Sequence, residues 1–230
     1  MSVNRRFVLK GAAVSSLGLT VDGFIPALAA NSEGSIGDEA TEPTMLALVN
    51  EGEAESVFLY GAMAAGKAPL RVQKVGRDLG FMLDFERRLR HGLPMRVIGL
   101  LDDASATLIV DMARSGGARV QWLGQHTAED GFTRHHVLST DMSEGCSQQL
   151  SRELHDCGAG FKLIEERQNG PMAPHQLTGS SRGTNQSAQW ASSIGYLLAS
   201  IGARTTLAAP LAPAANTPIT GSFVSFSIVA

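Results

Sequence analysis

The fold of this chain is decided by the stretch Met95-Arg-Val-Ile-Gly-Leu-Leu-Asp-Asp103. An apolar run that opens after Pro94 and closes at two acids is typical of a buried strand leading into a helix. Either acid can cap a helix over residues 104–115, and Gly116-Gly117 ends that helix. We therefore expect a central strand followed directly by a helix that packs against the sheet.

The alternation of strand and helix continues to residue 167 and predicts the order β-α-β-β-α-β. The predicted strands are 95–101, 118–125, 132–139 and 161–167, and the predicted helices are 104–115 and 144–157. The link between the second and third strands, residues 126–131, ends in the turn pair Asp130-Gly131 and is shorter than the dozen or so residues that a parallel crossover needs. A β-friendly run over 107–112 leaves a meander of hairpins as a second interpretation.

This order predicts an α+β fold, a two-layer sandwich with a ferredoxin-like centre over about 95–167. A three-layer α/β fold is the alternative. Further helices are expected within 45–65, 71–90 and 186–201, and a last strand over 223–229 is expected to add to a sheet edge. Residues 45–230 are expected to form one domain, whose flanking helices or a partner protein would cover the sheet face that two layers leave open.

The N-terminus carries the most specific motif in the chain. In Asn4-Arg-Arg-Phe-Val-Leu-Lys10 the pair Arg5-Arg6 is followed by one variable and two apolar residues, and small residues suited to cleavage end at Ala29. The stretch resembles the twin-arginine export motif of bacterial signal peptides. The resemblance implies that residues 1–29 are a removed signal, with an uncleaved anchor as the alternative. It also implies that the twin-arginine machinery exports the chain, as a folded protein, to the periplasm or beyond. Residues 30–44 are polar and predict a flexible linker.

Composition excludes several classes of protein. Apolar residues make up 43% of the chain, enough for a substantial core, and no run of about eighteen uncharged apolar residues predicts a stable membrane span. Removal of residues 1–29 takes away three cations and one anion, which changes the net charge from −3 to −5. We therefore expect no nucleic-acid partner.

Two stretches are candidates for ligand binding. Asp102 and Asp103 stand where the first strand ends, the position that favours ligand sites in open α/β sheets. The loop 179–187 combines glycines with the hydroxyl and cationic side chains of Ser181, Arg182 and Thr184, a composition that lets backbone amides approach an anion. Helix capping is the plainer interpretation of both stretches.

The histidines and cysteines predict no metal site. His135 and His136 point to opposite faces of one strand, so only one of them can join His126, and two imidazoles make a poor metal site. We expect histidines on the surface or on an edge strand. Cys146 and Cys157 lie eleven residues apart on one predicted helix, which places their Cα atoms roughly 16 Å apart, beyond the reach of a disulfide. They are predicted to be buried thiols, unless the helix begins later and allows a disulfide.

No nucleophile elbow, His-Glu-x-x-His or Cys-x-x-Cys motif is present in the sequence. We expect a periplasmic, non-catalytic binding or accessory protein that needs no cofactor and recognises a protein or a small ligand. The alternative is a small exported hydrolase or metal-dependent enzyme that combines the Asp102/Asp103 strand end with the loop 179–187.

Overall fold

The computed structural model describes residues 45–66, 69–76, 79–91, 94–168, 173–182, 188–202, 208–213 and 218–230. The predicted signal with Arg5, Arg6 and Ala29, the predicted linker 30–44, and Thr184 lie outside the described residues. All described residues fall within one compact unit. None of the described helices is long and apolar enough to cross a membrane.

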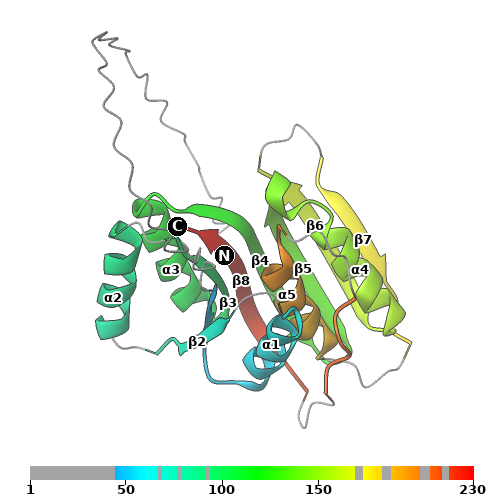
Figure 1. Ribbon diagram of the computed structural model, residues 1–230. Helices are drawn as coiled ribbons and strands as arrows, with labels where there is room; N and C mark the ends of the chain where they lie inside the picture. Colours follow the sequence, from blue (N-terminus) through cyan, green and yellow to red (C-terminus); the bar gives the residue numbers. More distant parts are fainter. Residues whose placement is uncertain are drawn as a thin grey trace, which may run out of the picture. The chain divides into compact units, whose positions relative to one another are not determined.

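The described residues form one eight-stranded sheet and five α-helices (Figure 1), so the broad prediction of mixed α+β structure is confirmed. The strands are β1 (Met45–Val49), β2 (Leu70–Lys74), β3 (Arg96–Leu101), β4 (Arg119–Glu129), β5 (Phe132–Ser139), β6 (Gly160–Arg167), β7 (His175–Gly179) and β8 (Gly221–Val229). The helices are α1 (Glu53–Ala64), α2 (Leu79–Arg90), α3 (Asp103–Ser115), α4 (Cys146–Asp156) and α5 (Gln189–Ser200), and a short 3-10 turn, η1 (Asp141–Ser143), precedes α4.

The elements β3 to β6 follow the predicted order, but their pairing is not ferredoxin-like. The sheet order is β2-β1-β3-β8-β4-β5-β6-β7. A ferredoxin-like sheet would place β5 between β3 and β4, whereas here β8 lies between them and is antiparallel to both. β5 instead pairs with the outer side of β4, and α4 leads from it to the parallel neighbour β6.

The position of β8 corrects the prediction of an edge strand. Val224, Phe226 and Ile228 face one side of the sheet, and Ser225 and Ser227 face the other, and all five are buried. Small serines on one face let helix α5 approach the sheet, while the apolar face packs under α3. The strand is therefore buried on both faces, which an edge position does not offer. On the neighbouring strand β3, Gly99 leaves the space that the Phe226 ring fills, since a Cβ on Gly99 would lie 2.3 Å from the ring.

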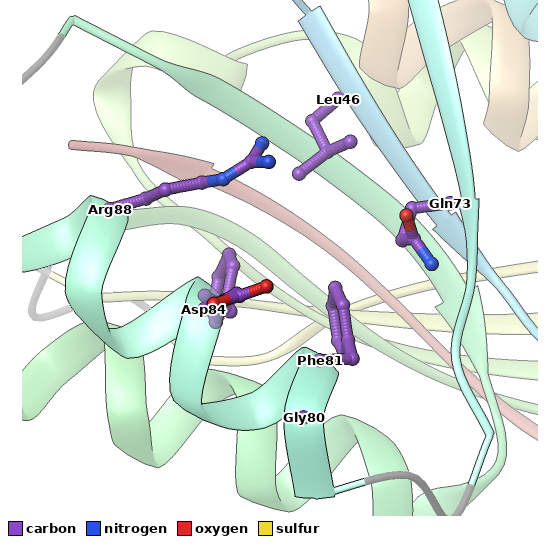
Figure 2. A pocket seen from close by; sticks show the side chains of 7 residues that line it. Leu46, Gln73, Gly80, Phe81, Asp84 and Arg88 are labelled. Carbon is purple, nitrogen blue, oxygen red and sulfur yellow. The ribbon is translucent and has the colours of Figure 1, made fainter.

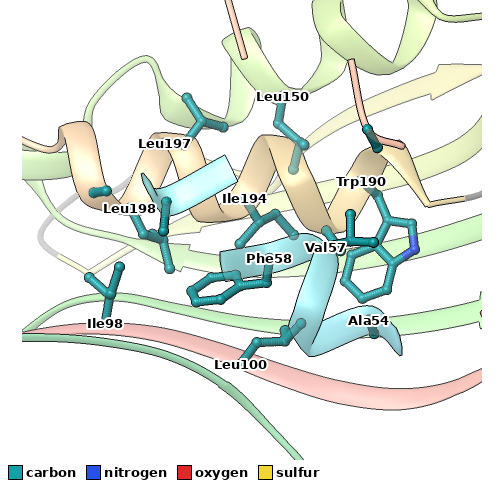
Figure 3. Packing of buried hydrophobic residues seen from close by; sticks show 14 of the residues in the cluster. Ala54, Val57, Phe58, Ile98, Leu100, Leu150, Trp190, Ile194, Leu197 and Leu198 are labelled. Atoms are coloured by element: carbon teal, nitrogen blue, oxygen red, sulfur yellow. The ribbon is translucent and has the colours of Figure 1, made fainter. Parts of the chain in front are cut away.

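Helices cover both faces of the half-sheet β1-β3-β8, which makes this part three-layered and corrects the two-layer prediction. Every residue of β1 is buried, so neither of its faces can be left to water. On one face α1 and α5 cover these strands and, together with α4, which lies over β6 and β7, enclose a core that contains Phe58, Ile98 and Trp190 (Figure 3). On the other face α2 and α3 enclose a second core.

Helices α1 and α5 pack with unusually close backbones because each has a glycine at the contact. A Cβ on Gly61 would lie 1.9 Å from the Ser192 carbonyl oxygen, and a Cβ on Gly195 would lie 2.0 Å from that of Phe58. At its other end α5 is capped by Arg96, whose guanidinium donates hydrogen bonds to the carbonyl oxygens of Leu198 and Ile201.

Three segments were assigned wrongly from the sequence. The stretch 45–65 is not one helix, since it begins as strand β1 and only α1 is helical. Every residue of β1 is buried, so its sequence lacks the alternation of apolar and polar residues that distinguishes a strand from a helix. The stretch 71–90 begins as edge strand β2, and only α2 is helical. No strand was predicted between residue 167 and the loop 179–187, but the edge strand β7 lies there.

Candidate functional site

The end of strand β3 is built as a helix cap. Asp102 accepts hydrogen bonds from the Ser105 backbone N–H (2.9 Å) and from the Ser105 hydroxyl (2.8 Å), so the predicted capping role is confirmed. The Asp102 backbone N–H donates to Asn50 Oδ1 (2.7 Å), and Asn50 Nδ2 donates to the Val75 carbonyl (3.0 Å). Burial alone would raise the pKa of Asp102, but the bonds from Ser105, Ala104 and Asn50 outweigh it and lower the pKa. Asp102 therefore stays ionised and is committed to structure.

A buried acid that the sequence reasoning missed lies beside this cap. Glu55, in the first turn of α1, is 6% exposed, and burial together with the negative charge of Asp102 raises its pKa. After β1 the chain turns to α1 on one face, and after β3 it turns to α3 on the other, so these residues stand at a topological switch point. Asp103 is exposed in the first turn of α3. The described residues contain no group of three or more potential metal ligands here or elsewhere.

The second predicted ligand-binding stretch lies far from the first. Ser181 and Arg182 follow β7, where the Arg182 backbone N–H donates to the Gly158 carbonyl (2.9 Å) and its guanidinium donates to His155 Nε2 (3.0 Å). Strands β3 and β7 are five positions apart in the sheet, or roughly 24 Å at about 4.8 Å per strand. The described parts of the two stretches are thus not brought together into one site.

Two of the histidines, His126 and His135, form a buried pair. His126 on β4 and His135 on β5 are paired across the strands and are 2% exposed, with their Nδ1 atoms 2.9 Å apart. The prediction that only one neighbour joins His126 is confirmed, since His136 lies on the other face and bonds Glu166 (2.8 Å). The prediction of surface or edge histidines is wrong for His126 and His135, because α5 covers this face and places Trp190 against both rings.

The hydrogen bonds of the pair run in one direction. Trp122 Nε1, which can only donate, bonds Ser225 Oγ (2.9 Å), and Ser225 in turn bonds His126 Nε2 (2.7 Å). At the other end His135 Nε2 bonds Thr133 Oγ1 (2.9 Å), whose hydroxyl donates to the carbonyl of Gly160 (3.4 Å).

Because the Thr133 hydroxyl donates its hydrogen to the Gly160 carbonyl, Thr133 Oγ1 must accept a hydrogen bond from His135 Nε2. This determines which nitrogen of each imidazole carries the proton. His126 carries its proton on Nδ1 and donates it to His135 Nδ1, and His135 carries its proton on Nε2. Every ring nitrogen is then satisfied with both imidazoles neutral. Burial lowers the pKa of His135 to about 3, and burial and the neighbouring ring lower that of His126 well below its ordinary value. Neither can exchange protons near neutrality, which makes the pair structural.

The two cysteines are thiols that do not form a disulfide. Helix α4 leads unbroken from Cys146 to Cys157, so the prediction of thiols in place of a disulfide is confirmed. The prediction that they are buried is wrong, because both are intermediate in exposure. Burial raises the pKa of Cys146 to about 11, with a further contribution from Glu165, and burial also raises the pKa of Cys157. Neither thiol has the lowered pKa of a catalytic nucleophile.

A cavity of about 280 Å³ lies between α2 and the strands β1 and β2. Figure 2 shows Phe81, Asp84 and Arg88 of α2 facing Leu46 and Gln73 across the hollow. Asp84 is already paired with Arg87 (2.9 Å). The lining offers an apolar floor and one cation but no nucleophile beside a base, so it suits a binding role better than a catalytic one.

On the side opposite α4 and α5, β4 begins under α3, where Val120 and Leu123 pack against the second core. The rest of this face, from Gln125 of β4 across β5 and β6 to β7, is termed the open face and is not covered by any described helix. Side chains aligned across the strands form two rows, one with Gln125, His136, Ile164 and Gln176 and one with Thr127, Arg134, Lys162 and Thr178. Phe132 and Leu138 add partly exposed apolar groups, and ion pairs Arg134–Glu129 and His136–Glu166 flank them.

Comparisons with known proteins give no relative: no family model, no curated protein and no solved structure matches the chain.

Proposed function

We propose that the chain is a periplasmic, non-catalytic binding or accessory protein that recognises a protein partner through the open face. The observation that carries this proposal is a four-stranded surface that no described helix covers. Its apolar groups lie between ion pairs, and Lys162 near its centre has no ion pair within the described residues. A partner with an apolar patch and an acidic group opposite Lys162 would be complementary.

The dimensions of the open face indicate the strength of binding. Four strands of about eight residues cover roughly 19 Å by 26 Å, or about 500 Å². A standard interface buries about 800 Å² on each partner. The surface is therefore sized for a transient complex, in keeping with an accessory role.

The lack of an assembled catalytic site also supports a binding role. The acids at the end of β3 serve as a cap or are exposed, the histidine pair is buried and neutral, and the thiols have raised pKa values. Ser225 does contact an imidazole, His126 Nε2 (2.7 Å), but both residues are buried and the lowered pKa of His126 makes it a poor base.

Site-specific photo-crosslinking in the native host tests the proposal. A photoreactive residue is placed at Gln125 or Thr178 on the open face, and at Met63 as a control, since Met63 is 56% exposed on α1 at the opposite face. We expect one discrete adduct from the two open-face positions and none from Met63. Loss of that adduct in Lys162→Glu would support charge complementarity. Equal labelling from all three positions, or no adduct from the open face, would refute the proposal.

Export by the twin-arginine route is a separate part of the proposal and has its own test. It rests on the resemblance of residues 4–10 to the export motif. Replacing Arg5 and Arg6 by lysine should retain the protein in the cytoplasm with residues 1–29 attached. The native protein recovered from the periplasm should begin near Ala30, and an intact N-terminus there would contradict cleavage.

A further inference from the structure

A cavity of about 450 Å³, larger than the one under α2, lies where β4 begins and β5 ends. Thr140 and Gln168, which line it, directly follow the carboxyl ends of the parallel strands β5 and β6. In open sheets, ligands bind beyond the carboxyl ends of parallel strands. The volume is within the range of cavities that hold small organic ligands.

A β-bulge and a capping box build the wall of this cavity. The pairing of β4 with β8 shifts between Val120 and Trp122, so Gln121 is an extra residue in its strand. The Gln121 carbonyl accepts hydrogen bonds from the Thr140 backbone N–H (3.3 Å) and hydroxyl (3.0 Å) and from the Ser143 hydroxyl (2.8 Å). Bulges next to binding or active sites redirect side chains, and the hydrogen bonds to the Gln121 carbonyl hold this bulge in place.

The side chain of Gln121 has an unused donor. The residue is 8% exposed, and its Oε1 accepts a hydrogen bond from Ser227 (3.4 Å). Within the described residues its amide nitrogen has no hydrogen-bond partner. This nitrogen is not one of the fully buried unpaired atoms, so it is accessible and can donate a hydrogen bond to a ligand in the cavity that Gln121 lines.

The charge of the lining favours an anion. Arg114 and Arg119 both line the cavity, and Asp141 is the one acid among its lining residues. Arg114 is 4.0 Å from Asp111, at the limit of ion pairing, and Arg119 has no ion pair within the described residues. Guanidinium groups match the geometry of carboxylate and phosphate oxygens.

We propose that this cavity binds a small organic anion, with its carboxylate or phosphate group held by Arg114 and Arg119. Gln121 donates to the same ligand, and Met142 and Val120 contact its apolar part. The proposal concerns a different surface from the open face and does not rest on the function proposed above.

Titration of the purified protein, followed by amide NMR shifts, tests this proposal. The probes are benzoate and phenyl phosphate, with benzyl alcohol as the uncharged control. We expect saturable shifts at residues 119–121 and 140–142 with at least one anion, and none with benzyl alcohol. The comparison of the two anions shows which oxyanion is preferred.

Arg119→Gln should weaken the binding about tenfold or more, because it removes a charge-assisted hydrogen bond. Arg90→Gln, at an exposed arginine of α2 that lines neither of the two cavities described, is the matched control and should bind as the unmodified protein does. Preserved dispersion of the remaining signals confirms that each variant is folded. An absence of saturable shifts at millimolar anion, or an unchanged affinity in Arg119→Gln, would overturn the proposal.

Discussion

Acidification should destabilise this protein through its buried histidine pair, and His135→Gln should remove a defined part of the effect. The amide of glutamine accepts through its oxygen and donates through its nitrogen, so it can take the place of His135 between His126 and Thr133. The replacement cannot be protonated in this pH range. It therefore isolates the proton chemistry of His135 from its hydrogen bonds.

The magnitude follows from the difference in pKa between the unfolded and folded states. His135 has a pKa of about 3 when folded and about 6.5 when unfolded. Between these values the unfolded chain binds the extra proton, so the free energy of unfolding falls as the pH falls. The slope approaches about 1.4 kcal/mol per pH unit well below the unfolded pKa, which gives roughly 2 kcal/mol between about pH 6.5 and 4.5. His126, whose pKa is also lowered, adds a loss of the same sign.

Urea denaturation at a series of pH values is the appropriate assay, and tryptophan fluorescence is a suitable signal because Trp122 and Trp190 are buried beside the pair. Between about pH 6.5 and 4.5, the free energy of unfolding of the native protein should fall by roughly 2 kcal/mol more than that of His135→Gln. Carboxylates titrate in both proteins and cancel in this comparison. Parallel pH profiles for the two proteins would refute the assignment of a neutral, buried His135.

Three further outcomes follow from the packing, the cap and the thiols. Gly195→Ala forces a Cβ against the Phe58 carbonyl and should lower the free energy of unfolding by about 3 kcal/mol, whereas Gly76→Ala, with open space at its Cβ, should change it little. Asp102→Ala should cost about 1 kcal/mol in the same urea assay through loss of the α3 cap, and more than Asp103→Ala. Both cysteines should react slowly with a thiol reagent in the folded protein near neutral pH and rapidly in urea, and fast labelling of the folded protein would contradict the raised pKa values.

The sequence predicted local structure where the signal was local. Strand β3, the Asp102 cap and the Asp130-Gly131 turn were all found because apolar runs, caps and turn residues act over a few neighbours. The insertion of β8 between β3 and β4 could not be found this way, since β8 begins at Gly221, about 90 residues after β4 ends at Glu129. No local pattern encodes a pairing at such a separation.

The same limit applies to the candidate sites. The sequence did not single out Glu55, because its burial next to Asp102 depends on the parallel pairing of β1 with β3. The burial of the histidine pair depends on α5, which is more than 50 residues away in the sequence. The alternation of side chains along β5 did separate His135 from His136, because that pattern is local.

The central place of β8 has a consequence for how the chain reaches its folded state. Without β8, strands β2-β1-β3 and β4-β5-β6-β7 would be two separate sheets, and β3 and β4 would each present an unpaired inner edge of the kind that recruits other chains. Joining the halves closes contacts between residues far apart in sequence, which is slow. If the chain travels by a route that accepts folded cargo, insertion of β8 is the step that sets when it can leave the cytoplasm.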